Sequence, residues 1–592
     1  MGIGFTIDTP LKVAQYGISS VISTVDDILV ERLRKFYSEK FDLPFQEISS
    51  KAEDFRAKRF TAYLDMLYDV ASDNLEEIKK SFQNKTHKEL DKLMSLLPDT
   101  SGIKNKFQDY LSNNPNAQDV YNWLDEHLHL GDIDVNIMTK VDRDNYRNGV
   151  KLPAEYNDAL AALRGFANSK LTSSVVLSAG MNPRLYGYID KFDDFFPDEN
   201  FNLRKKIILK VSDYRSAIIQ GKYLAKRGIW ISEYRIESGL NCGGHAFATD
   251  GFLMGPILDE FKSNKQDLID EVHELYIKAL EEKGKNIPSK PFNVKITAQG
   301  GVGTNEEHEF LMSNFDVDAV GWGTPFLLVP EAVSIDNKTL NQLSDAKEDD
   351  LYLSNISPLG VPFNSLRGNT KDIEKDDNIL KGKPGSTCPK QFVKLNNEFG
   401  EKALCVASRQ YQTKKISELK SKNLPQVEFR KSYKNITDKS CICVGLSTAT
   451  LHVNNLDYKV EGPGVSVCPG PNMAYYEKER SLKEMVDHLY GKTNILTRSD
   501  RPNMFVKELN LYINYFKKQL ADLTFESTKK EVITLRKFQK NLNAGIDFYL
   551  NLFNSVKDDV IKQRNEILHE FIKLRDDLNT LTVEAVTKPI LA

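Results

Sequence analysis

The sequence predicts an α/β protein built on a (β/α)8 TIM barrel, enlarged by a helical insertion, an irregular Cys-bearing region and a C-terminal helical hairpin. Short runs rich in Val, Ile and Leu alternate with stretches of helical periodicity, which is typical of parallel strands covered by helices. Counting the N-terminal runs brings the strands to about eight, which fits a closed barrel better than an open sheet. The 592 residues exceed what one hydrophobic core supports, so we expect several structural units.

Four segments are expected along the chain. Residues 1–30 and 131–335 form the barrel, 31–130 a helical insertion or cap, 336–500 the irregular region and 501–592 the helical tail. The opening "GFTIDTPLKVAQYGISSVIS" predicts a short strand, a turn at Thr9 and Pro10, a helical piece and a second strand. The later strands are expected at "VNIMTKV", "SSVVLSAG", "KKIILKVS", "IWISEYRI", "NVKITAQGG" and "AVGWGTPFLL".

Helical periodicity marks the insertion and the tail. Within the insertion, apolar residues recur at spacings of three and four. They are Phe60, Tyr63, Leu64, Leu67 and Tyr68. In the tail two apolar faces are separated by Thr528 and Glu531 at capping-box spacing, which predicts a helical hairpin that serves packing or homo-oligomer formation. The first face is Phe505, Leu509, Ile513, Phe516, Leu520 and Leu523, and the second is Leu535, Phe538, Leu542, Ile546, Tyr549 and Phe553.

Charge and hydropathy exclude several classes of protein. The formal net charge is −3 with mixed-sign patterns, so nothing indicates nucleic-acid binding. No run of about 18 apolar residues and no export signal is found, so we expect a cytoplasmic protein without a membrane partner.

Glycines follow two late strands. Gly300, Gly301 and Gly303 come after one strand and before a helix, and Gly321, Gly323 and Thr324 repeat the arrangement. Backbone N–H groups at such strand ends can face a phosphate, and the following helix N-terminus favours an anion. In a barrel these late loops are the usual phosphate position. The alternative is that each glycine only makes a tight turn.

A histidine stands at another strand end, in "RIESGLNCGGHAFATDG". Gly243 and Gly244 let the backbone approach a flat ligand, and His245 can hold or pass a proton near neutral pH. A histidine satisfied by local hydrogen bonds is the alternative.

The order of these motifs resembles the FMN-dependent family that includes nitronate monooxygenase, the FMN-containing enoyl-acyl carrier protein reductase and the enoyl reductase subunit of polyunsaturated fatty acid synthases. The resemblance covers roughly residues 1–30 and 131–330, through "TIDTPLKVAQYGISSV", "VNIMT", "NCGGHAF" and "ITAQGGVGTNEEHEFLMSNFDVDAVGWGTPFLL". It implies Asn136 and Lys210 near the flavin ring, a phosphate held by the two glycine loops and Thr324, and His245 as the acid/base or substrate-polarising group. The helical insertion departs from the family, so the resemblance does not transfer a substrate class.

The irregular region carries five of the six cysteines. Cys388 and Cys468 are each followed by a proline, and the Cys-Pro dipeptide is often seen beside the ligands of iron–sulfur clusters. Four thiolates can hold an iron–sulfur cluster or a zinc ion. We take Cys388, Cys405, Cys443 and Cys468 as candidate ligands, although no CxxC pair exists. Buried structural thiols are the alternative interpretation. The segment "CICVGL" is expected to form a short strand.

Together these patterns predict an FMN-dependent oxidoreductase acting on a small-molecule or acyl-type substrate. No second dinucleotide fingerprint is present, so electrons would come from a partner protein or from NAD(P)H visiting the same site. The alternatives are a non-catalytic flavin-binding scaffold and a barrel enzyme that binds another phosphate-bearing ligand.

Overall fold

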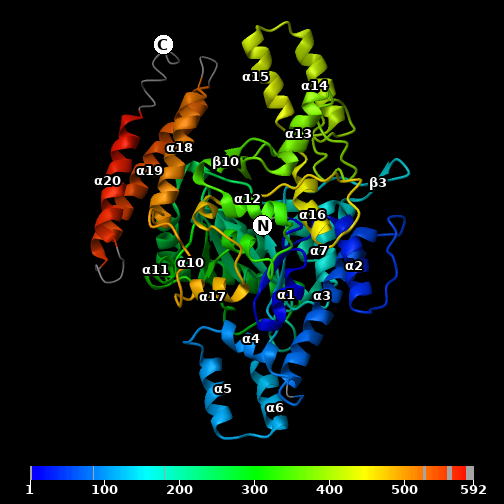
Figure 1. Cartoon of the computed structure of the whole chain (residues 1–592), viewed down its shortest axis with the longest axis vertical. Helices are drawn as coiled ribbons and strands as arrows, with labels where there is room; N and C mark the ends of the chain where they lie inside the picture. The colour runs from blue at the N-terminus through cyan, green and yellow to red at the C-terminus, as the bar shows by residue number, and fades with distance from the viewer. Residues whose placement is uncertain (1–2, 85, 179, 524–527, 557–562, 582–592) are drawn as a thin grey trace.

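A sheet of seven parallel strands forms the centre of the molecule. The computed structural model describes residues 3–84, 86–178, 180–523, 528–556 and 563–581 (Figure 1). Neighbouring strands follow one another in chain order, so each crossover returns to the adjacent position and the sheet curls into a half-barrel. In order the strands are β1 (Ser20–Ser23), β2 (Ile133–Ile137), β5 (Ser174–Leu177), β6 (Lys206–Val211), β7 (Glu233–Glu237), β8 (Lys295–Gln299) and β9 (Ala319–Gly321).

The predicted closure into a (β/α)8 barrel is wrong. Within the described ranges no eighth strand joins β1 to β9. The N-terminal segment expected to supply that strand forms turns over residues 3–8, followed by α1 (Thr9–Val13). Its backbone groups are bonded elsewhere, since Gly4 N–H donates to Leu446 O at 2.8 Å and Ser334 N–H donates to Phe5 O at 2.8 Å. These bonds take the place of a sheet ladder.

The two faces of the sheet differ in polarity. On β7, Tyr234 and Ile236 are buried in the apolar core, whereas Glu233, Arg235 and Glu237 line the interior of the curl. Helices pack on the outer face, in keeping with parallel βαβ units. They are α7 (Asp158–Ala167), α8 (Pro183–Ile189), α9 (Tyr214–Ala225), α10 (Met254–Lys283) and α11 (Asn305–Phe315).

The segment between β1 and β2 is helical, and α5 and α6 project from one end of the molecule (Figure 1). Of the apolar face expected here, Phe60, Tyr63, Leu64 and Leu67 are buried, while Tyr68 is exposed. A Cβ at Gly165 of α7 would lie 2.6 Å from Phe60 Cβ, so glycine allows the two helices to approach closely. The helices are α2 (Asp27–Lys40), α3 (Phe55–Lys80), α4 (Lys88–Leu96), α5 (Gly102–Ser112) and α6 (Ala117–His127).

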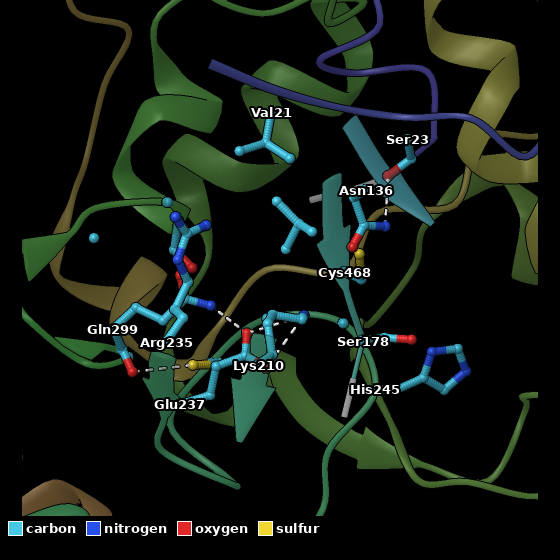
Figure 2. Close-up of a pocket in the computed structure, with 18 of the residues that line it drawn as sticks. Val21, Ser23, Asn136, Ser178, Lys210, Arg235, Glu237, His245, Gln299 and Cys468 are labelled. Atoms are coloured by element: carbon cyan, nitrogen blue, oxygen red, sulfur yellow. Dashed lines mark hydrogen bonds and ion pairs between the residues drawn. The ribbon is translucent and has the colours of Figure 1, made fainter. Parts of the chain in front are cut away.

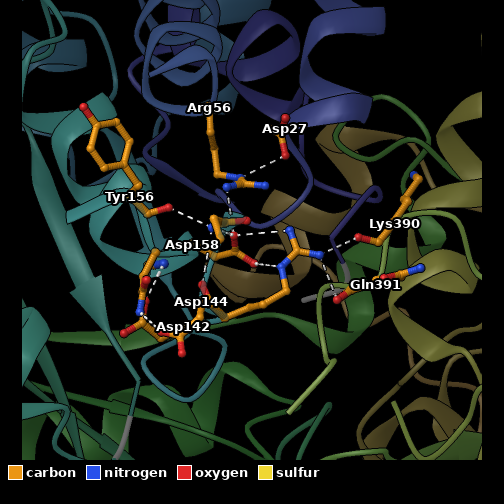
Figure 3. A network of polar contacts seen from close by, with 12 residues as sticks. Asp27, Arg56, Asp142, Asp144, Tyr156, Asp158, Lys390 and Gln391 are labelled. Carbon is orange, nitrogen blue, oxygen red and sulfur yellow. Dashed lines mark hydrogen bonds and ion pairs between the residues drawn. The ribbon is translucent and has the colours of Figure 1, made fainter. Parts of the chain in front are cut away.

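A buried ionic network ties the helical insertion to the sheet layer (Figure 3). Arg56 contacts Asp27 at 3.1 Å and Asp158 at 2.9 Å. Arg143 pairs with Asp158 at 3.3 Å and donates to the carbonyls of residues 390 and 391, both at 2.9 Å. Four segments distant in sequence therefore meet at one cluster.

The region after β9 contains more helix than the sequence suggested. The segment "CICVGL" is not a strand, because it starts α16, a helix whose side chains are buried almost all around. Burial on every side removes the amphipathic pattern that would have marked it as a helix. The elements are α12 (Asn337–Asp345), β10 (Leu351–Ser354), β11 (Phe363–Leu366), α13 (Thr370–Leu380), α14 (Arg409–Ser421), α15 (Gln426–Thr437), α16 (Ile442–Val453) and α17 (Leu482–Leu489).

The tail packs beside the sheet as α18 (Met504–Ala521), α19 (Lys529–Ser555) and α20 (Arg564–Thr580) (Figure 1). The first two are the predicted hairpin, and Thr528 with Glu531 forms the predicted capping box. The third helix joins through aromatic contacts, with Tyr549 stacked on Phe571. No described helix combines the length and the apolar character needed to cross a membrane.

Candidate functional site

A cavity of about 700 Å³ runs through the curl of the sheet, from the loops at the carboxyl ends of the strands to Ser20, Asp132 and Lys295 at their amino ends. Its volume falls within the range of small-molecule and cofactor sites, roughly 300–1,000 Å³. The cavity is lined by every predicted catalytic and cofactor-binding residue. These are Asn136, Lys210, Gly243, Gly244, His245, Gly300, Gly301, Gly321, Gly323 and Thr324.

His245 lies on the loop between β7 and α10 (Figure 2). Gly244 has a φ of 79°, and a Cβ at Gly243 would lie 2.6 Å from Cys468 O, so both positions require glycine. Ala246 N–H donates to Pro362 O at 2.9 Å, and Asn364 N–H donates to Gly244 O at 2.9 Å. The β10–β11 hairpin therefore fixes the backbone on both sides of the histidine.

The His245 imidazole is held neutral. Its Nε2 lies 2.7 Å from Ser357 Oγ. Burial, followed by the nearby charges of Lys140 and Lys210, lowers the pKa of His245 to about 4. Near pH 7 the ring can therefore donate or accept a hydrogen bond without carrying charge.

Polar side chains from neighbouring strands face the same cavity (Figure 2). Lys210 forms an ion pair with Glu237 at 3.2 Å, and Gln299 also donates to Glu237. Asn136 Nδ2 donates to Ser23 Oγ at 3.2 Å. The cavity lining thus combines charged and amide side chains with branched apolar ones such as Val21 and Val176.

The glycine loops have two different physical roles. Gly301 has a φ of 82°, and a Cβ there would lie 2.0 Å from Asn241 Nδ2, so packing alone demands glycine. Gly323 differs, because a Cβ there would meet nothing within 4 Å. Within the described part of the chain, the N–H groups of Gly323 and Thr324 have no hydrogen-bond acceptor. This second loop retains free donors beside an open space, as an anion site requires.

A carboxylate already occupies part of the first loop. Glu307 accepts from Gly303 N–H at 2.9 Å and forms an ion pair with Arg501 at 2.8 Å. Both side chains are less than one tenth exposed, and Arg501 also donates to Gly301 O at 2.8 Å. Thr304 and Glu307 have the spacing of a capping box, so the sequence contains a signal for the position of Glu307. No sequence pattern near Glu307 indicates that Arg501 is its ion-pair partner.

Three of the four predicted cysteine ligands interact around Cys388, and Cys468 lies apart from them. Of the predicted four, Cys443 is hydrogen-bonded to Cys388 and Cys405 feels the charge of Cys388, while Cys441, which was not predicted, also contacts Cys388. Hydrogen bonds from Cys441 and Cys443 lower the pKa of Cys388. Cys468 instead lies on a segment against the histidine loop, where its carbonyl accepts from Gly244 N–H at 3.1 Å.

Among the described residues, no group of three or more His, Cys, Asp or Glu side chains is arranged to hold a metal ion. All six cysteines are free thiols, and five of them are buried. Iron–sulfur ligation therefore stays a prediction.

Sequence reasoning missed Ser357, the hydrogen-bond partner of His245. It lies 112 residues away in the chain, in a loop without any motif. Such a contact has no local signal.

Comparisons with known proteins give little guidance. No protein-family model matches the chain, and no curated protein matches its sequence. Among solved structures, it is similar to the enoyl reductase domain of MlnA from the macrolactin biosynthesis cluster of Bacillus amyloliquefaciens. The TM-score is 0.33 with 14% identity, over 66% of this chain and 86% of that one.

Proposed function

We propose that this chain is an FMN-dependent oxidoreductase whose substrate, a small or acyl-type molecule, lies beside His245. One observation carries the proposal: His245 and the two glycine loops, predicted from their motifs, line one cavity together with Asn136 and Lys210, which the family resemblance implies. Open α/β sheets bind ligands at the carboxyl ends of their strands.

The residues present fit an FMN. The free N–H groups of Gly323 and Thr324 border a space that a side chain would partly fill, which suits a phosphate. Asn136 and Lys210 stand at the ends of β2 and β6, where they can contact the polar edge of the ring. When bound, the flavin would supply the transfer of hydride or electrons.

His245 would manage the accompanying proton or polarise the substrate. Its neutral imidazole suits hydrogen bonding to a carbonyl-like oxygen, and its pKa of about 4 makes it a weak base. Electrons would reach the site from NAD(P)H or from a partner protein.

The first test is an absorbance spectrum of the freshly isolated protein, recorded without oxygen, with the cofactor identified by mass. We expect a flavin spectrum that bleaches on reduction and FMN in a ratio near one per chain. A colourless protein that does not bind added FMN would overturn the proposal.

The second test separates an enzyme from a flavin-binding scaffold. His245→Ala should keep FMN but lose turnover by about a hundredfold or more, the usual contribution of an acid–base group. His273→Ala is the matched control, since His273 lies on α10, packs against Trp230 and does not line the cavity. Equal activity of both variants would indicate a scaffold or a different catalytic group.

A further inference from the structure

Ser357 reaches His245 from a part of the chain that does not belong to the central sheet. It lies in the loop between β10 and β11, and its Oγ is 2.7 Å from His245 Nε2. The side chain is fully buried, with an exposed fraction of 0%. The hydrogen bond between Ser357 and His245 is therefore part of the packed interior and not a contact between exposed side chains.

The surroundings of the hydroxyl set the direction of this hydrogen bond. Ser357 Oγ already accepts from Leu359 N–H at 3.2 Å. In the part of the chain that the structure describes, His245 Nε2 is the available acceptor for the hydroxyl proton. A buried hydroxyl that kept its proton unpaired would lose free energy, so Ser357 donates and Nε2 accepts.

A neutral imidazole that accepts at Nε2 carries its proton on Nδ1. No partner contacts Nδ1 within the described ranges, and this atom is not among the buried polar atoms that lack one. Nδ1 is therefore accessible, and His245 itself lines the cavity.

We propose that Ser357 is a positioning residue that holds His245 as the Nδ1–H tautomer and leaves that N–H group free to donate to the substrate. The assignment deepens the proposed oxidoreductase function and rests on it for its catalytic meaning. The tautomer itself can be measured without any turnover.

A serine beside a histidine is also the arrangement of a nucleophile and its base. Two observations favour positioning. The pKa of His245, lowered to about 4 by burial, makes the ring a poor base for a hydroxyl. Ser357 borders the cavity, but its exposed fraction of 0% leaves little room for its oxygen to attack a substrate.

Hydrogen bonds from Lys439 fix the backbone of the loop that carries Ser357. Lys439 Nζ donates to Asn355 O at 2.6 Å and to Ser357 O at 3.2 Å. With the backbone bonds of Ala246 and Asn364 to the same hairpin, these contacts fix serine and histidine relative to each other. Such support is what keeps a catalytic side chain in one geometry.

The test is nitrogen NMR of the full chain without ligand, labelled with 15N-histidine. The nine histidines are resolved by comparison with His245→Gln. We expect the His245 signals of the wild type to show a protonated Nδ1 and an unprotonated, hydrogen-bonded Nε2. In Ser357→Ala the signals should move toward a mixture of tautomers, because the donor to Nε2 is gone.

The matched control is Ser354→Ala in the same hairpin. Ser354 is equally a buried serine, but its hydroxyl bonds Phe363 O and Ser365 Oγ, both at 2.8 Å, and not the histidine. It should leave the His245 signals in place. A wild-type ring protonated on Nε2, or unchanged signals in Ser357→Ala, would overturn the positioning role even in an active enzyme.

If turnover is found, Ser357→Ala should lower kcat by about tenfold with KM nearly unchanged, and Ser357→Thr should restore most of it. If Ser357→Ala shifts the His245 tautomer but the protein binds no flavin and shows no turnover, the positioning role is supported and the oxidoreductase proposal is wrong. A raised KM with an unchanged kcat in Ser357→Ala would contradict the role of Ser357 in positioning the reacting group.

Discussion

His245 illustrates how one side chain acquires its properties from its immediate neighbours. Burial and the positive charges of Lys140 and Lys210 disfavour the imidazolium, and Ser357 occupies one ring nitrogen. The ring is thus neutral over the whole physiological pH range.

This neutrality predicts the pH profile. Since the pKa of His245 is lowered to about 4, the acid limb of kcat/KM should lie near pH 4 and not near 6.5. Lys140→Met removes a positive charge and should move the limb to higher pH. Lys278→Met, at an exposed position on α10, should leave it unchanged. An acid limb near 6.5 in the wild type would contradict the electrostatic account.

We expect Gly323 to contribute mainly to FMN binding and Gly301 mainly to the stability of the fold. Gly323→Ala has open space and a φ of −126°, so its free energy of unfolding should change by about 0.5 kcal/mol or less, while FMN affinity falls about tenfold. Gly301→Ala places a Cβ against Asn241 at a φ of 82°, and should cost about 2 kcal/mol or more of stability. Urea unfolding and FMN titration measure the two effects. Equal behaviour of the two variants in both measurements would argue against distinct roles.

At the scale of elements, α18 is anchored to the sheet by a buried carboxyl group. Glu508 contacts Ser238 Oγ at 2.5 Å, Met254 N–H at 3.1 Å and Tyr549 Oη at 2.9 Å. Ser238 follows β7 directly and lines the cavity, so the tail helices support the loop that leads to the histidine.

Burial raises the pKa of Glu508 to about 7, which predicts a pH-dependent stability. Between about pH 4.5 and 7 the folded state holds a proton that the unfolded state has lost, so stability should fall as pH rises through this window. Glu508→Gln should flatten that part of the Tm–pH curve. Glu531→Gln, in the exposed capping box of α19, is the control and should keep the slope. The same slope in Glu508→Gln would show that another group is responsible.

At the scale of the whole molecule, the buried ionic cluster joins the insertion, the sheet layer and the region after β9. Removal of Arg56 would leave Asp27 and Asp158 with fewer partners in a buried place. We expect Arg56→Ala to cost about 3–5 kcal/mol, the usual loss when one member of a buried pair is removed.

An exposed ion pair provides the comparison. Lys170 contacts Asp69 at 2.6 Å with side chains 54% and 47% exposed, so Lys170→Ala should cost below about 1 kcal/mol. Chemical denaturation of both variants measures the difference. A loss below about 1 kcal/mol for Arg56→Ala would show that the cluster does not hold the segments together.

The sequence alone determined the parallel strands, the helical insertion, the first two tail helices and the glycine and histidine motifs at strand ends. These features follow from apolar spacing, capping residues and turn chemistry, all of which act within a few residues. Because parallel strands bring their carboxyl ends to one edge, His245 and the glycine loops could be expected to meet at one cavity.

Only the tertiary structure decided whether the sheet closed, how the cysteines grouped and what holds His245. The N-terminal segment bonds to residues 334 and 446 instead of β1 and β9, and Ser357 reaches His245 across 112 residues. Such contacts depend on the packing of the whole chain, which can override the local preference for a strand and leaves no local signal for a partner distant in sequence.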